Sequence, residues 1–116
     1  MDVRKFAPSD AELERSPGQT DEIYVGDVVG QADSAPITIG FGRWGPGAML
    51  TETMAVDDVM IVLEGRLSVE SAAGTWDVGP GELVHMPKGE RVTIRTSDEG
   101  ARTAYVTYPH WSEARN

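Results

Sequence analysis

Two short apolar stretches in the second half of the chain, bounded by glycine and proline, constrain the fold most strongly. Residues 57–65 form an almost unbroken apolar run that ends in glycine, which is typical of a strand that is buried on both faces and then turns sharply. Residues 79–89 start with Gly-Pro-Gly, continue as a short apolar strand over 82–86 and stop at Pro-Lys-Gly. Between these stretches, residues 66–78 alternate around Ala73-Gly74 and predict a hairpin.

Further segments alternate in the same way and predict more short strands. Residues 48–56 follow a second Gly-Pro-Gly and have no clear period. About eight short strands separated by glycine and proline turns predict an all-β sandwich or barrel. The remaining expected strands are residues 23–29, 37–44, 91–95 and 102–108, with a turn at 97–100.

The 116 residues suffice for one domain with a core of its own. Residues 1–22 are polar and interrupted by prolines, so we expect an N-terminal arm that lies on the barrel. The barrel is expected over residues 23–111, and residues 112–116 form a polar tail.

The formal net charge of -9 argues against nucleic acids and anionic membrane surfaces as partners, because both require clustered lysine and arginine. The chain has no cysteine, which excludes disulfides and thiolate chemistry and fits a reducing compartment. The N-terminal residues lack the apolar core of a signal peptide, and no apolar run reaches the length of a membrane span. We therefore expect a cytoplasmic protein.

The glycine and proline frame resembles the two sequence motifs of the cupins, which are double-stranded β-helix (jelly-roll) barrels. Gly45, Asp58 and Gly65 match the spacing of the first motif. Gly81 and the Pro-Lys-Gly at 87–89 match the second. The resemblance covers residues 37–108 and implies a cupin barrel with a short N-terminal arm, in which residues 48–56 form the rim where ligands enter.

A narrower resemblance points to the ethanolamine-utilisation branch, the EutQ-like cupins. It rests on Phe41 and Trp44, on the Asp-Asp-Val start of 57–65, on Pro-Lys-Gly, and on the Tyr-Val and Pro-His-Trp of residues 105–111. An acetate kinase activity is ascribed to that branch, but no phosphate-binding loop in this sequence supports it. The resemblance to small cupins also implies a homodimer, formed through edge strands or the N-terminal arm.

In cupins, three histidines and one carboxylate commonly hold a first-row metal. Asp58 takes the carboxylate position here. The paired histidine positions are Thr51 and Thr53 in one alignment, and Glu52 and Met54 in the other. Val92 replaces the third histidine. We therefore expect no metal and no other cofactor.

Asp58 is the strongest candidate for chemistry. It can be an inward carboxylate whose pKa the apolar cavity raises, acting as a general base or binding a ligand, or it can be a solvated rim residue. Alternation along the strand places Asp57 on the opposite face. His85 can be a half-buried core residue or the acid–base partner of Asp58 in the cavity. His110 is expected at the surface.

The remaining candidates are ligand contacts. Glu52 is a third possible acid or base if it faces inward, whereas the alternative alignment turns Thr51 and Thr53 inward. Among the aromatic residues, Trp44 is the best candidate for a pocket wall and Trp76 is expected to pack in the core. The full set of expected ligand contacts is Trp44, Thr51, Thr53, Met54, Val92 and Tyr105.

Two classes of function fit these features. The first is a single-domain EutQ-like cupin that binds a small organic metabolite, with metal-independent acid–base catalysis of the isomerase, lyase or cyclase type if it is an enzyme. The second is a non-catalytic ligand-binding or accessory protein. A deep cavity that contains Asp58 and His85 favours the enzyme, and a barrel filled by side chains favours the second class.

Overall fold

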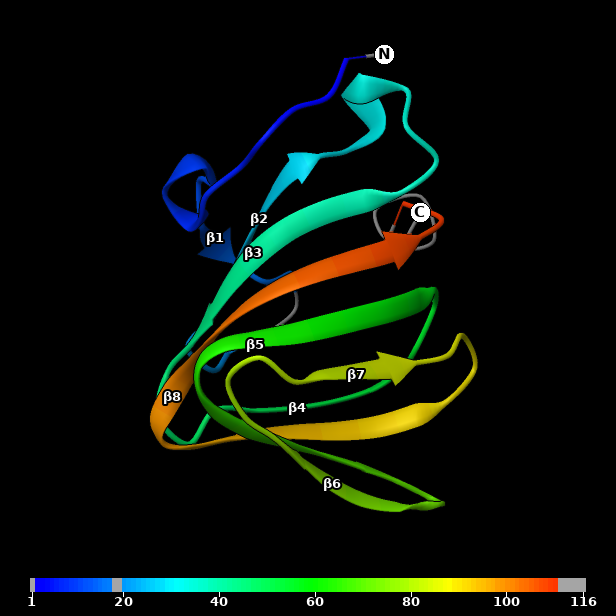
Figure 1. Ribbon diagram of the computed structural model, residues 1–116. Coiled ribbons are helices and arrows are strands. Elements are labelled where there is room, and N and C mark those ends of the chain that lie inside the picture. The colour runs from blue at the N-terminus through cyan, green and yellow to red at the C-terminus, as the bar shows by residue number, and fades with distance from the viewer. Residues whose placement is uncertain (1, 18–19, 111–116) are drawn as a thin grey trace.

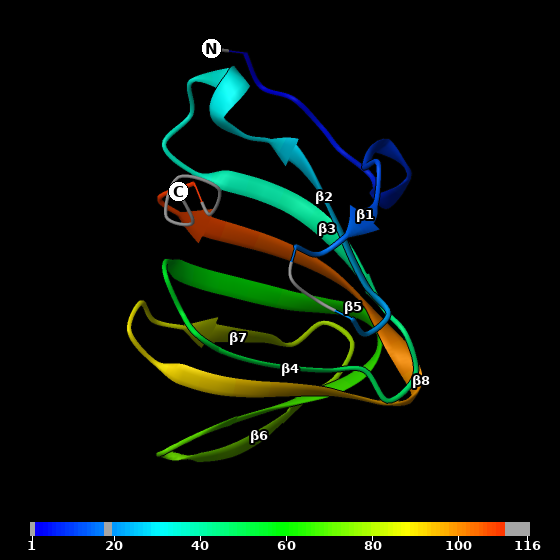
Figure 2. The ribbon, with the colours of Figure 1, turned by 180° about the vertical axis from the view of Figure 1, so that it is seen from behind.

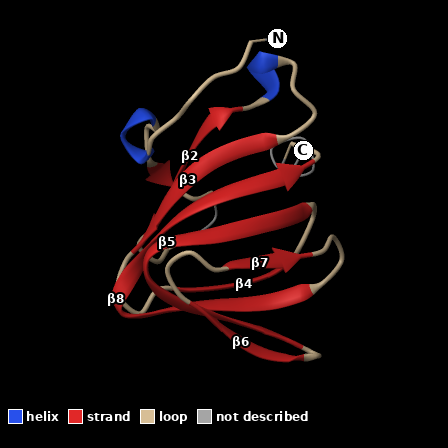
Figure 3. Cartoon of the chain, viewed as in Figure 1, coloured by secondary structure: helices blue, strands red, loops and turns tan. Residues whose placement is uncertain are grey.

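Strands make up most of the described chain. The structure, a computed structural model, describes residues 2–17 and 20–110. Its described helical segments are two single 3-10 turns, η1 (Pro8–Asp10) and η2 (Gln31–Asp33), and both lie beside the sheets (Figure 3). This confirms the predicted all-β fold. The strands are β1 (Glu14–Arg15), β2 (Ile23–Val29), β3 (Thr38–Trp44), β4 (Met49–Thr53), β5 (Asp57–Ser71), β6 (Gly74–Val78), β7 (Leu83–Met86) and β8 (Arg91–Tyr108).

The two longest strands, β5 and β8, belong to both walls of the barrel (Figure 1). In the first wall the strand order is β1-β2-β3-β8-β5-β7, and in the second it is β4-β8-β5-β6. The first half of β5 pairs with β7 and the last part of β8, and its second half pairs with β6 and the first part of β8. All of these pairings are antiparallel, as expected for the jelly roll.

Two glycines allow β5 and β8 to bend from one wall into the other. Gly65 has φ +77° and Gly100 has φ +73°, values that favour glycine. A Cβ atom at Gly65 would collide with the carbonyl oxygen of Gly100. The expected turn at residues 97–100 is therefore wrong, because β8 passes through this segment as one bent strand.

The segment that lacked a clear period, residues 48–56, contains a regular strand. Each residue of β4 lies opposite a residue of β8, from Met49 beside Arg95 to Thr53 beside Arg91. A strand was not predicted for this segment. The pattern is hidden because Glu52, a polar residue, takes one of the inward positions.

The N-terminal arm lies against the edge of the first wall (Figure 2). Its short strand β1 pairs with β2 of the same chain. The arm approaches β2 so closely that a Cβ atom at Gly26 would lie 2.6 Å from the carbonyl oxygen of Glu12. The expected polar tail (112–116) and the barrel's last expected residue, 111, lie outside the described residues.

The interior between the walls is filled mainly by aliphatic and methionine side chains. The largest fully buried apolar ones are Ile23, Leu67, Met86, Ile94 and Val62. They come from both walls, so the two sheets share one core. None of the described helical segments is long and apolar enough to cross a membrane.

Candidate binding site in the barrel

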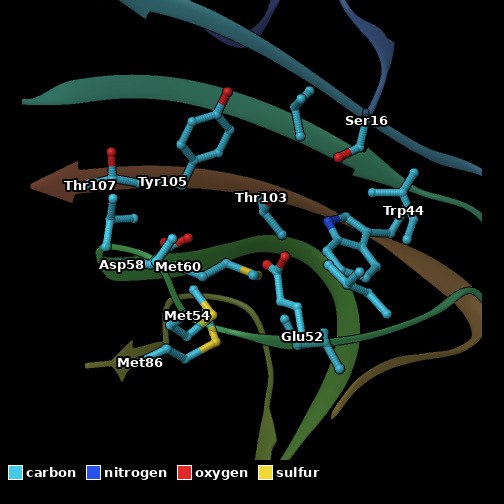
Figure 4. A pocket seen from close by; sticks show the side chains of 16 residues that line it. Ser16, Trp44, Glu52, Met54, Asp58, Met60, Met86, Thr103, Tyr105 and Thr107 are labelled. Atoms are coloured by element: carbon cyan, nitrogen blue, oxygen red, sulfur yellow. The ribbon is translucent and has the colours of Figure 1, made fainter. Parts of the chain in front are cut away.

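A cavity of about 100 Å³ lies between the two walls, beside the core (Figure 4). Strands β2, β3, β4, β5, β7 and β8 all contribute to its lining. The polar side chains among the lining residues are Ser16, Glu52, Asp58, Thr103, Tyr105 and Thr107. The apolar part of the wall includes Trp44, Met54, Met60 and Met86. The space is enough for several water-sized groups, and so for a small organic molecule.

Asp58 enters this cavity because of the alternation along β5. Met60 and Val62 on the same strand are buried, and Asp58 shares their face. The Oδ1 atom of Asp58 is buried, and no hydrogen bond reaches it from any residue that the structure describes. Asp57 points to the outer face, as predicted, and is 51% exposed.

The cavity changes the acid–base properties of Asp58. Burial raises the pKa of its carboxyl from the ordinary 3.8 to about 7, and the negative charge of Glu52 adds to the increase. A carboxyl with this pKa exists in both protonation states at neutral pH. It can therefore donate a hydrogen bond to a ligand or accept a proton from one.

The register of β4 decides between the two alignments of residues 51–54. Glu52 and Met54 line the cavity. Thr51 faces outward, where its hydroxyl lies 3.0 Å from that of Thr93, and Thr53 is exposed as well. The structure thus does not bring Thr51 and Thr53 to the cavity.

Val92 lies opposite Glu52 and is buried in the core, but it does not line this cavity. Instead it lines a lateral cleft of about 430 Å³ that β6 and β7 help to form. Met86 lines both the cleft and the cavity. Trp76, expected in the core, also lines the cleft and is 49% exposed, because it lies on the edge strand β6.

His85 is not in the cavity. It lies opposite Val59 on the outer face, is 56% exposed, and its Nε2 is 3.1 Å from Oδ1 of Asp57. Neither the expected core position nor the expected pairing with Asp58 is found. The reason is strand alternation, because Met86 on the same short strand takes the inward position and His85 must point the other way.

The two aromatic residues expected as ligand contacts both reach the cavity. Trp44 and Tyr105 line it. The hydroxyl of Tyr105 donates a hydrogen bond of 2.6 Å to Oδ1 of Asp27, and burial together with this bond raises the pKa of Tyr105. Sequence reasoning missed Asp27 because it lies in β2, far along the chain from β8. Strand pairing through β3 brings it close, since Asp27 and Tyr105 both lie opposite Gly40.

His110 was expected at the surface but is buried. Its Nδ1 lies 3.2 Å from the hydroxyl of Thr38, and its Nε2 contacts the carbonyl oxygen of Ala35. Both partners are more than 70 positions away in the sequence, so no local pattern could have indicated this position.

The donor set does not fit the metal that the cupin resemblance implies. The four corresponding positions are Glu52, Met54, Asp58 and Val92, which provide two carboxylates and no imidazole. First-row metals bound by cupins depend on imidazole nitrogens. Among the described residues, no group of three or more histidine, cysteine, aspartate or glutamate side chains could hold a metal ion.

Comparison with known proteins agrees with the barrel. The family described as ethanolamine utilisation protein EutQ matches residues 9–113. The acetate kinase EutQ of Salmonella typhimurium is 30% identical over 83 residues, a match that covers 72% of this chain and 35% of that protein. The chain thus spans about a third of the length of this relative.

The fold is shared with solved structures, among them the following two. A structural-genomics protein of unknown function from Rhizobium leguminosarum is 63% identical, with a TM-score of 0.80, covering 95% of this chain and all of that one. A putative ethanolamine utilization protein Q from Salmonella typhimurium is 26% identical, with a TM-score of 0.82, covering 93% and 87% of the two chains. Because the family match extends over most of the sequence and the barrel is the same, the chain belongs to the EutQ family of cupins.

Proposed function

We propose that this chain binds a small organic molecule in the barrel cavity and that Asp58 exchanges a proton or a hydrogen bond with it. The observation that carries the proposal is the buried Oδ1 atom of Asp58, which faces the cavity and has no donor among the described residues. A buried, unpaired carboxyl is costly for a fold. A ligand that satisfies it accounts for its presence.

If the chain is an enzyme, the chemistry we propose is metal-independent proton transfer of the isomerase, lyase or cyclase type. A carboxyl with a pKa of about 7 suits general acid–base catalysis at neutral pH. His85 is excluded from the step because it lies on the outer face. Glu52 is the second carboxylate in the lining, so the pair Asp58 and Glu52 replaces the expected pair Asp58 and His85.

The acetate kinase activity named for the Salmonella relative finds no support in this cavity. Phosphoryl transfer depends on cations that neutralise the phosphate charge. None of the described lining residues is lysine, arginine or histidine. We therefore assign the cavity to a ligand without phosphate groups.

The test is a ligand screen by saturation-transfer NMR, with a panel of small amines, alcohols, ketones and carboxylic acids. We expect at least one compound to bind the wild type and to lose affinity for Asp58→Asn. Asp57→Asn is the matched control, since it removes a carboxylate from the same strand on the outer face. If no compound binds, or if both variants bind as the wild type does, the proposal is wrong.

We also propose a homodimer. The outer face of the first wall carries the half-buried apolar side chains Phe41, Val59, Ile61 and Val106, next to Leu83, which is 61% exposed. Such a surface suits a second copy of the chain. Light scattering at micromolar concentration should give twice the mass of 12.5 kDa, and Leu83→Asp should lower it. A monomeric wild type would exclude the dimer.

A cytoplasmic location stays a prediction, to be tested by cell fractionation.

A further inference from the structure

Both charged side chains in the described lining of the cavity are carboxylates, those of Glu52 and Asp58. No described lining residue carries a positive charge. The protein as a whole has a formal net charge of -9, which further favours cations near the entrance. The electrostatics of the site therefore oppose an anionic ligand and favour a cationic one.

The hydrogen-bonding groups near Asp58 point to a ligand that is a donor. Two hydroxyls in the lining already donate elsewhere, that of Tyr105 to Asp27 and that of Thr107 to the carbonyl oxygen of Pro109. The buried Oδ1 atom of Asp58 has no donor among the described residues. A bound molecule with N–H groups satisfies it directly.

The rest of the wall distinguishes an organic cation from a metal ion. Calcium and magnesium need six or more oxygen ligands. Here the carboxylates are instead surrounded by Met54, Met60 and Met86 and by the indole of Trp44. Polarisable sulfur and aromatic faces pack well against alkyl groups and against organic cations.

We propose that the ligand of this cavity is a small organic amine in its ammonium form, with its N–H groups donating to Asp58 and Glu52 and its carbon chain packed on Trp44 and the methionines. This inference rests on the proposed function, namely that the cavity binds a small molecule. It adds the chemical class of that molecule.

Binding of an amine should change the protonation of Asp58. An ammonium group beside Asp58 stabilises its carboxylate form, so binding lowers the pKa of Asp58 and releases a proton near pH 7. A ligand that is a neutral acceptor, such as a ketone, binds the protonated form and takes a proton up. The other titratable groups facing Asp58 are Glu52 from β4 and Tyr105 from β8. The cavity residues of β3 and β7, Trp44 and Met86, do not titrate.

The experiment is isothermal titration calorimetry at about pH 7 with n-butylamine, n-butanol and butyrate, which share a carbon chain and differ in charge. Each titration is repeated in two buffers of different ionisation enthalpy, so that proton release is measured directly. We expect butylamine to bind about ten- to a hundredfold more tightly than butanol, as for a hydrogen bond to a charged group, with release of a fraction of a proton. Butyrate should bind most weakly.

Three variants test whether butylamine binds at these carboxylates. Asp58→Asn should abolish the proton release and weaken butylamine binding, and Glu52→Gln should weaken binding while the proton release persists. Asp57→Asn should behave as the wild type. Thermal melts confirm that each variant is folded.

Butanol or butyrate binding as tightly as butylamine, or proton uptake on binding, would overturn the amine class but leave the proposed function standing. If butylamine does not bind, the inference is wrong. The NMR screen of amines, alcohols, ketones and carboxylic acids then tests the proposed function, which is wrong if none of these compounds binds.

Discussion

Replacing Asp58 by asparagine should change the dependence of stability on pH by a predictable amount. In the folded protein the pKa of Asp58 is about 7, and its ordinary value is 3.8. Because the pKa is raised on folding, the folded state binds this proton more tightly than the unfolded state. The carboxyl therefore lowers the free energy of unfolding increasingly as the pH rises from about 4 to about 7, and by a constant amount above that.

The magnitude follows from the shift. About three pKa units at about 1.4 kcal/mol each give roughly 4 kcal/mol. The Asp58→Asn variant has no charge to bury at this position. The difference in free energy of unfolding, variant minus wild type, should therefore increase by about 4 kcal/mol between about pH 4 and about pH 8. Groups that do not interact with Asp58 titrate alike in both proteins and cancel in the difference.

The assay is urea unfolding at several pH values, followed by tryptophan fluorescence and analysed by linear extrapolation. Asp57→Asn is the control. Its carboxylate is half exposed, with Oδ1 3.1 Å from Nε2 of His85, so the difference from the wild type should stay within about 1 kcal/mol at every pH. A difference for Asp58→Asn that stays flat with pH, or that decreases as the pH rises, would refute the assignment of Asp58 as a buried, unpaired carboxyl.

Three further predictions concern other parts of the molecule. Gly65→Ala should destabilise the barrel by at least about 1–3 kcal/mol in urea unfolding, because it combines a positive φ with a clash against the carbonyl oxygen of Gly100; an unchanged midpoint would contradict this. His85→Ala should leave ligand binding unchanged and alter the free energy of unfolding by no more than about 1 kcal/mol. Loss of binding in a folded variant would show that this outer-face residue contributes to the binding site. Elemental analysis of the purified protein should find far less than one transition metal per chain, since the four metal positions provide no imidazole; a stoichiometric metal that is lost in Asp58→Ala would reverse that conclusion.

The fold could be predicted from the sequence because turns and apolar strands alternate regularly through most of it. The sequence left two positions open for Asp58, inward or at the solvated rim, and the structure places it inward, on the buried face of β5 that Met60 and Val62 share. The bend at Gly100 was mistaken for a turn, because a glycine with positive φ gives the same local signal in either case. Only the pairing of β8 with its neighbours on both sides of this segment, at residues 91–96 and 101–108, distinguishes the two.

The site could be predicted only in part. We expected His85 in the core or in the cavity, although Val84, His85 and Met86 alternate apolar, polar and apolar, which is the local signal for an outward His85. Leu83 obscured this signal, because it is apolar and yet faces outward with Ile61. The facing of Glu52 depended on the register of β4, and no local pattern fixes that register. The hydrogen bond of Tyr105 to Asp27 depends on tertiary pairing alone.

The most direct test of the central claim is an NMR titration of the side-chain carboxyl carbons of Asp58 and Asp57 in the free protein and with butylamine. We predict that the Asp58 carboxyl titrates near pH 7 in the free protein and at lower pH once the amine is bound, and that butylamine leaves the Asp57 titration unchanged. If Asp58 titrates near its ordinary value of 3.8, it is solvated, and the proposed binding site in the barrel is wrong. If Asp58 titrates near pH 7 in the free protein but no compound of the panel changes its titration, the carboxyl is buried without a ligand. The proposed function would then be wrong.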